Sequence, residues 1–317
     1  MRLTDNVHKQ DIGQSLHALL RERCGALPER LPGTRHRFTH IINPYRCPPG
    51  SVGDRTQRLT FAALAQARQL AAGRHRVDTV AVGFPDDRDF AAAFFDRHAT
   101  IGRTVLDGRR FQVPRPLPLL FDLLEAGVGG PGDDGDDGGH IIFTNTDICP
   151  APGFYDAIAA LLDLGFDALT INRRTVASYP PDASWLPLAA AEPGRPHEGF
   201  DCFVFPRAAF PHYRRSDACI AAGGVMRSLL YNMVAFSRNM LMLTDAHLTC
   251  HIGDDKEWDR PELRDYVTHN WAEARRVFDH LAPEHGRRLQ AFCDTHGEWD
   301  LLPRHGAPAD GGGNHAD

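Results

Sequence analysis

The stretch HIIFTNTD, residues 140–147, decides the class of fold. An apolar run at 141–143 is followed at once by Asn145, Thr146 and Asp147. A short apolar run bounded by polar residues is typical of a strand that is buried in a sheet. This strand stops on a small polar cluster with one carboxylate. The cluster is either an ordinary helix cap or turn, or a place where a charged ligand is held.

Strands alternate with helices on both sides of this stretch. Apolar runs predict strands at 37–43, 77–84, 140–144, 166–172, 201–206 and 241–255, with a short one at 103–107. Helical composition and periodicity predict helices near 11–24, 55–72, 88–97, 117–127, 154–162 and 224–241. Alternation of this kind predicts an α/β fold, with a mostly parallel central sheet and helices on both faces. The second half of the chain is less regular.

Composition narrows the class of protein. The chain has 317 residues, 42% of them hydrophobic, and a net charge of −6, which fits a globular protein and argues against a general nucleic-acid coat. No apolar run approaches the roughly 20 residues that span a bilayer. The beginning of the chain has no apolar signal segment, and the cysteines are scattered without a CxxC pair. We therefore expect a cytoplasmic protein with reduced thiols.

Several nucleotide-binding and catalytic motifs are missing. No GxxxxGK[ST] is present, no GxGxxG follows the first strand, and no GxSxG occurs. These absences disfavour P-loop kinases, NAD enzymes and α/β-hydrolases. Ligands of parallel sheets bind beyond the carboxyl ends of the strands. Three such ends carry polar side chains here, namely Asn43, Asp86 with Asp87, and Asn145 with Asp147.

A histidine completes the candidate metal ligands. His251 follows the apolar part of the late strand, and Asp254 and Asp255 come directly after it. If that strand lies beside residues 140–144, Asp147 and His251 could share a divalent cation. Oxygen ligands with one imidazole suit Mn²⁺ or Mg²⁺. The alternative for His251 is a structural histidine with satisfied hydrogen bonds.

Four segments in this order resemble a known family. They are THIINPY at 39–45, FTNTDI at 143–148, GFDCFVFPR at 199–207 and LTCHIGDDKEW at 248–258. Together they resemble a nucleotide-sugar-dependent glycosyltransferase of the A-type (GT-A) fold. The resemblance covers roughly residues 36–260.

The resemblance implies a donor site at the three strand ends. It implies that Asp147 and His251 hold Mn²⁺ or Mg²⁺ on the nucleotide diphosphate, beside Asn145 and Thr146. It also implies that the base and ribose are held by Asn43, Pro44, Tyr45 and Asp86 or Asp87. One departure matters, because Asn145 replaces the first acid of the family's Asp-x-Asp motif. The site therefore lacks one negative charge, which leaves metal-independent or degenerate activity open.

Four further residues are candidates for chemistry. Asp201 precedes an apolar strand, and we interpret it as a general base or a sugar contact. Glu198 is a competing base, and a plain turn aspartate is the alternative for Asp201. Arg173 and Arg174 follow the strand at 166–172. One of them could contact the diphosphate, unless both belong to a solvated strand end.

These observations predict a glycosyltransferase that moves a sugar from a uridine or guanosine diphosphate donor to an unidentified small-molecule or glycan acceptor. We expect a helical extension at 1–35, a single GT-A domain at 36–300 and a disordered tail at 301–317. The donor half would span about 36–172 and the acceptor half about 173–300. The alternatives are a sugar-nucleotide pyrophosphorylase and a non-catalytic nucleotide- or sugar-binding protein.

Overall fold

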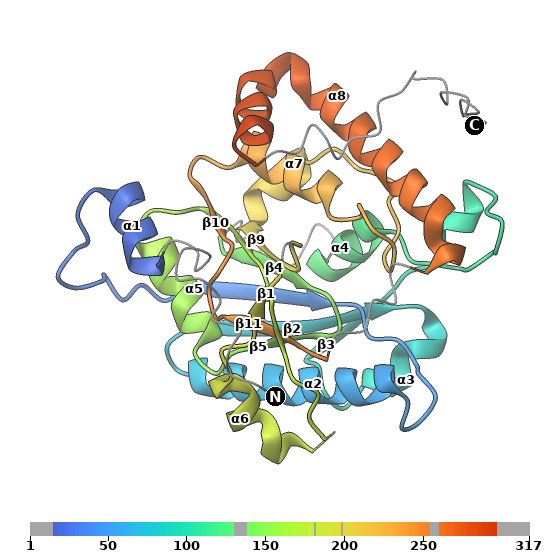
Figure 1. Ribbon diagram of the computed structural model, residues 1–317, viewed down its shortest axis with the longest axis horizontal. Helices are drawn as coiled ribbons and strands as arrows, with labels where there is room; N and C mark the ends of the chain where they lie inside the picture. The colour runs from blue at the N-terminus through green and yellow to red at the C-terminus, as the bar shows by residue number, and fades with distance from the viewer. Residues whose placement is uncertain (1–14, 130–137, 181, 198, 254–259, 297–317) are drawn as a thin grey trace, which may run out of the picture.

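A seven-stranded sheet forms the centre of the molecule (Figure 1). The computed structural model describes residues 15–129, 138–180, 182–197, 199–253 and 260–296. The strands run in the order β3 (Arg97–Thr100), β2 (Arg76–Gly83), β1 (Arg37–Ile42), β4 (His140–Thr144), β9 (Cys202–Pro206), β6 (Ala168–Ile171) and β10 (Met240–Leu243). The pairs are parallel, except that β9 runs antiparallel to both of its neighbours.

A second, small sheet lies beside the carboxyl ends of the central strands. Its order is β5 (Ile148–Pro150), β11 (Thr249–Ile252), β7 (Arg174–Val176) and β8 (Arg195–Pro196). β5 begins four residues after the end of β4, and β7 begins three residues after the end of β6. The segments that leave β4 and β6 therefore both pair with the same strand, β11.

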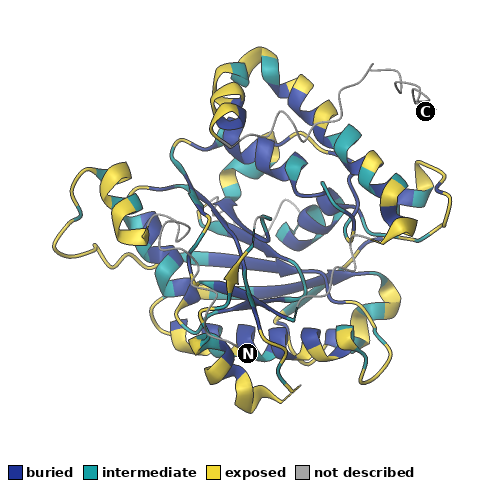
Figure 2. Ribbon diagram, in the orientation of Figure 1, coloured by how far each residue is buried: buried dark blue, intermediate teal, exposed yellow. Residues whose placement is uncertain are grey.

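Helices cover both faces of the central sheet, as predicted. One face packs against α2 (Val52–Ala71) and α5 (Phe154–Asp163), whose apolar sides share a core with the strands. The other packs against α4 (Leu120–Val128), α7 (Arg227–Phe236) and α8 (Arg264–His296). Figure 2 shows the strands dark with burial between these layers, while the helices expose their outer sides. The prediction of a mostly parallel α/β sheet is confirmed.

Some predicted elements differ from the structure. The strand predicted at 103–107 is a 3-10 helix, Val105–Asp107, because Thr104 and Asp107 form a capping box at its start. The third strand is instead β3, and the helix near 88–97 shrinks to α3 (Arg88–Ala91). The strand at 241–255 divides into β10 and β11, one in each sheet.

Parts of the predictions lie outside the described residues. These are most of the acidic stretch at 127–139, Glu198, Asp254 with Asp255, and the tail. The structure does not test the domain boundaries, which stay predictions. In the ranges that the structure describes, no helix combines the length and apolar character needed to cross a membrane.

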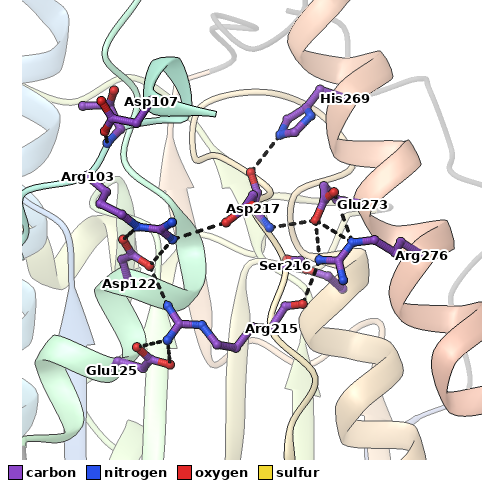
Figure 3. Close-up of polar contacts among 12 residues, drawn as sticks. Arg103, Asp107, Asp122, Glu125, Arg215, Ser216, Asp217, His269, Glu273 and Arg276 are labelled. Carbon is purple, nitrogen blue, oxygen red and sulfur yellow. Dashed lines mark hydrogen bonds and ion pairs between the residues drawn. The ribbon is translucent and has the colours of Figure 1, made fainter. Parts of the chain in front are cut away.

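A network of charged side chains links α4, the loop before α7 and α8 (Figure 3). Arg103 donates to both carboxylate oxygens of Asp122, at 2.9 and 3.0 Å, and to Asp217 at 3.3 Å. Glu273 on α8 accepts from the backbone N–H of Asp217 at 2.8 Å and from Arg276 at 2.7 Å. Ion pairs whose arginines are exposed contribute about 0–1 kcal/mol each, so this network adds little to the stability of the fold.

Two histidines lie in the sheet, His40 fully buried and His140 half-buried. His40 on β1 is fully buried, and its ring nitrogens contact the Tyr155 hydroxyl at 2.8 Å and the Thr144 hydroxyl at 2.9 Å. Burial lowers the pKa of His40 to about 3. Burial, with a smaller effect of His36, lowers the pKa of His140 to about 4. Both imidazoles are therefore neutral in the native protein at neutral pH.

These histidines predict a loss of stability in weak acid. Unfolded histidine titrates near pH 6.5. Below that pH the unfolded chain binds protons that the native state does not, so the free energy of unfolding falls as the pH falls. We expect each histidine to cost about 2 kcal/mol at pH 5.0 relative to pH 7.5. Urea melts at both pH values measure this difference.

The matched controls are single substitutions. His140→Asn should reduce the pH dependence, whereas His17→Gln, at an exposed position of α1 (Leu16–Cys24), should leave it unchanged. A pH dependence in His140→Asn equal to that of the wild type would contradict the assignment of the His140 imidazole as neutral.

Candidate functional site

The antiparallel strand β9 brings one aspartate to the ends of two parallel strands. Cys202, its first residue, lies opposite Thr144 of β4 and opposite Ile171 of β6. Both of these residues are the last of their strands. Asp201, the residue before Cys202, therefore lies beside the two segments that leave β4 and β6.

Asp147 and His251, the two predicted metal ligands, contact each other directly. The Oδ2 atom of Asp147, in the turn between β4 and β5, lies 3.2 Å from Nε2 of His251 on β11. The pairing of β5 with β11, which sets His251 opposite Ile148, enforces this contact. Nδ1 of His251 lies 2.9 Å from the carbonyl oxygen of Gly253. That oxygen can only accept, so Nδ1 carries a proton and Nε2 faces the carboxylate.

Charge and burial act against each other in this pair. Burial favours a higher pKa for Asp147, but the hydrogen bond and charge of His251 and the charge of Arg173 outweigh it, so the pKa of Asp147 is lowered. Burial likewise disfavours the charged form of His251, yet the contact with Asp147 raises its pKa. The Asp147 side chain keeps 38% of its surface exposed and His251 only 3%. A ligand would thus reach the pair from the side of Asp147.

A second charged pair lies next to the first. Nη1 of Arg173 is 3.6 Å from Oδ1 of Asp201, and both side chains are buried. That separation allows an ion pair but is too long for a hydrogen bond. Burial raises the pKa of Asp201 to about 6, and the charge of Arg173 limits the rise. The alternative of Arg173 as part of a solvated strand end is wrong, since only 8% of it is exposed.

Four buried polar atoms at this place have no hydrogen-bond partner among the residues that the structure describes. They are Oδ1 of Asp147, Oδ1 of Asn172, Nε of Arg173 and Oδ2 of Asp201. Buried polar groups in folded proteins are nearly always paired, and leaving one unpaired costs about 1–3 kcal/mol. The set consists of three acceptors and one cationic donor. A polar or charged ligand bound here could supply the missing hydrogen bonds.

The residues present are compatible with a divalent cation. Two ligands at right angles, each about 2.1 Å from an ion, lie about 3 Å apart, close to the 3.2 Å between Asp147 and His251. Among the residues that the structure describes, no group of three His, Cys, Asp or Glu side chains could share a metal. A cation held here would therefore complete its shell with water and the ligand's own oxygens, as Mg²⁺ commonly does.

The predicted nucleoside contacts lie at the ends of β1 and β2. Asn43 donates through Nδ2 to the carbonyl of Val82 at 2.6 Å, so its amide ties the two strands together. Tyr45 keeps 46% of its surface exposed. Asp87 accepts from the backbone N–H of Arg46 at 2.8 Å. Pro44 and Asp87 line one small surface pocket, together with Gly83, Phe84, Arg88 and Ala99. The side chain of Asp86 is exposed.

Three residues were missed or misread from the sequence. Gln57 of α2, 1% exposed, contacts both the loop after β1 and Thr146. Asn172, 3% exposed, ends β6 and presents the unpaired oxygen named above. A polar residue on the apolar side of a helix was the available signal for Gln57. Arg174 is structural, because its guanidinium pairs with Asp245 and donates to the carbonyl of Gly194.

Solved structures resemble the chain at low sequence identity. Residues 1–349 of S. aureus TarS in complex with UDP-GlcNAc match at 12% identity and a TM-score of 0.42, over 85% of this chain and 76% of that chain. A putative nucleotide-diphospho-sugar transferase from Desulfovibrio desulfuricans matches at 14% identity and 0.35, over 77% and 99%. A 4-diphosphocytidyl-2C-methyl-D-erythritol synthase from Anaerococcus prevotii matches at 12% and 0.35, over 76% and 96%.

No protein-family model matches the chain. The comparison with curated proteins finds no match either. At the identities and TM-scores of the solved structures, the likeness concerns the fold and nothing more.

The fold is an α/β fold with a mostly parallel central sheet, and its assignment to the nucleotide-diphospho-sugar transferase (GT-A) type stays a prediction. Its marks are the mostly parallel seven-stranded sheet, the single inverted strand β9 next to β4, and the small second sheet at the strand ends. The predicted α/β class with a mostly parallel central sheet is confirmed. A fold of this kind does not fix an activity, which must be argued from the site.

Proposed function

We propose that the protein is a glycosyltransferase that takes a sugar from a uridine or guanosine diphosphate donor. One observation carries the proposal: four unpartnered buried polar atoms gather beyond the carboxyl ends of β4 and β6. This is the place where α/β sheets bind their ligands. The donor's nucleoside would lie toward Tyr45 and Asp87, and its diphosphate toward Asp147.

The chain's own charges suit a leaving diphosphate. Asp147 and His251 would hold Mn²⁺ or Mg²⁺, and such an ion, when bound, stabilises the charge of the departing diphosphate. Arg173 would add a guanidinium whose Nε–H has no partner in the described part of the chain. Arg173 lies 3.6 Å from Asp201. This ion pair would hold the guanidinium at the site whether or not the donor is bound.

Asp201 is the proposed general base. A base works best when its pKa lies near the working pH, and burial raises the pKa of this carboxyl to about 6. It is therefore mostly ionised at neutral pH and can accept the proton of an acceptor hydroxyl through Oδ2, which has no partner among the described residues. The competing base, Glu198, lies outside the described residues.

The loop after β1 disfavours a pyrophosphorylase. That class needs a basic, glycine-rich loop at this position, and here the loop at 43–51 holds one arginine. Arg46 donates through its backbone to Asp87 at 2.8 Å and through Nη2 to the carbonyl of Asp86 at 3.5 Å. The side chain of Arg46 therefore contacts the segment that follows β2.

A non-catalytic binding protein is the remaining alternative, and Asn145 in place of an acid favours it. The two functions differ in turnover. Slow hydrolysis of a nucleotide sugar, with water as the acceptor, separates an enzyme from a binder when it is assayed with and without Mn²⁺.

We expect uridine or guanosine diphosphate to raise the melting temperature when Mn²⁺ or Mg²⁺ is present. A ligand at 100 times its dissociation constant adds about 2.7 kcal/mol to the free energy of unfolding. For a chain of this size that corresponds to a shift of several degrees, which differential scanning fluorimetry resolves. Adenosine diphosphate serves as the control nucleotide. If no nucleoside diphosphate at millimolar concentration shifts the melting temperature, the proposed donor site is wrong.

A further inference from the structure

The side chain of Gln57 makes every hydrogen bond that an amide can make. Its Oε1 accepts from the backbone N–H of Tyr45 at 3.1 Å and from the hydroxyl of Thr146 at 3.0 Å. Its Nε2 donates to the carbonyl of Tyr45 at 2.9 Å and to Sγ of Cys47 at 3.3 Å. An amide offers two acceptor lone pairs and two donor hydrogens. Gln57 is therefore saturated by two separate segments of the chain.

These two segments are the two ends of the proposed donor site. The loop at 43–47 follows β1 and carries the exposed ring of Tyr45, whereas the turn at 145–147 follows β4 and carries Asp147. β1 and β4 are neighbours in the sheet. The amide of Gln57 hydrogen-bonds to both the loop and the turn, and it thereby connects them.

Gln57 is anchored on a rigid element. Its helix α2 has 20 residues, begins at the cap Ser51 and packs Phe61 and Leu64 into the core beneath the sheet. Asp54, one turn before Gln57, is buried and accepts from the backbone N–H of Gly50 at 2.9 Å. The amide of Gln57 is thus held in position by the helix, and both loops take their positions from it.

We propose that Gln57 is a positioning residue of the donor site, which holds the nucleoside-binding loop and the diphosphate-binding turn at a fixed separation. The inference rests on the proposed function. A nucleoside diphosphate spans both segments, and each half of it touches only one. Two linked half-sites reinforce each other only when their spacing suits the linked ligand. Loss of Gln57 should therefore weaken the binding of the intact nucleotide, while the binding of the nucleoside alone and of pyrophosphate alone should change little.

The experiment compares three probes on each variant. They are UDP or GDP, whichever the wild type binds more tightly, the matching nucleoside alone, and pyrophosphate alone, all with Mg²⁺. Calorimetry measures the affinities for the nucleotide and for pyrophosphate, and ligand-observed NMR measures the affinity for the nucleoside, which is expected to bind weakly. For Gln57→Ala we expect the affinity for the intact nucleotide to fall by about tenfold or more. The affinity for each half should change by less than about twofold.

Two further variants sharpen the test. Thr146→Val removes a single hydrogen bond, should reproduce the pattern, and should add nothing in the double variant because both residues act through one contact. It also serves as the test if Gln57→Ala does not fold. Gln69→Ala, at an exposed position of the same helix, is the matched control and should bind all three probes as the wild type does.

The outcomes separate the two proposals. If a folded Gln57→Ala binds the intact nucleotide as the wild type does, or loses the halves by the same factor as the whole, Gln57 is an ordinary structural residue. If the wild type itself binds neither UDP nor GDP, the donor site fails, and the role of Gln57 fails with it.

Discussion

Turnover of the nucleotide-sugar donor is expected to fall by about 10²–10⁴-fold when Asp201 is replaced by asparagine. The amide would keep the shape of the side chain but could not accept a proton. The affinity for the nucleoside diphosphate should change little, because Asp201 is proposed to act on the acceptor hydroxyl. Donor hydrolysis measures the first quantity and calorimetry the second.

A stability cost accompanies this substitution and needs a matched control. Asp201→Asn leaves the buried charge of Arg173 without its partner, and breaking a buried pair costs about 3–5 kcal/mol. Asp245→Asn breaks a pair of comparable burial, with Arg174, at a position without a proposed catalytic role. It should lower stability while leaving turnover within a few-fold. Undiminished turnover in a folded Asp201→Asn variant would exclude Asp201 as the base. Glu198 would then be the remaining candidate.

Replacing Asp147 by asparagine is expected to weaken metal-dependent nucleotide binding by about 100-fold. Loss of residues that merely support metal ligands costs about 10–100-fold, and a charged ligand should reach the upper end. His251→Ala should cost less, because imidazole supplies a neutral nitrogen. The two effects should be non-additive, since either loss already disrupts the shared site. Calorimetry with nucleotide, with and without Mn²⁺, measures both.

Asn145→Asp is the informative companion. It restores the second acid of the Asp-x-Asp motif and should tighten Mn²⁺ binding if residue 145 touches the ion. Nucleotide binding without metal should stay nearly constant across all these variants. Strictly additive losses in the double-mutant cycle, together with no effect of Asn145→Asp, would return the 3.2 Å contact of Asp147 and His251 to the status of a plain ion pair.

The central strands could be predicted from the sequence because each is an apolar run that stops on polar residues. β3 escaped prediction because its sequence, Arg-His-Ala-Thr, has no apolar run, as suits a partly exposed edge strand. Val105 and Leu106 imitated a strand, although Thr104 and Asp107 mark a helical turn. Local pattern identifies buried strands well and edge strands poorly.

The site was predictable where one segment carries its own polar cluster, as at Asp147. The strand ends placed Asp147 and His251 near each other only on the condition that their strands are close, and the structure brings them into contact. Their shared role in metal binding stays a prediction. The pairing of Arg173 with Asp201 depends on the direction of β9, which its five residues do not reveal. Gln57 depends on four hydrogen bonds to partners in separate segments of the chain. Such long-range relations are decided by packing.

The position of β9 has a consequence for how the chain is synthesised. β6 pairs only with β9 and β10 among the described strands, and both lie later in the chain. A nascent chain that has emerged as far as residue 171 can therefore form the part from β3 to β4, while β6 waits unpaired. The arrival of residues 202–206 joins the two parts, and Asp201 enters together with that closing strand. The joining of the two parts of the sheet and the arrival of Asp201 are thus one event, whereas β10 and His251 follow later in the chain. A prematurely released chain that ends before residue 200 carries open apolar strand edges and no Asp201.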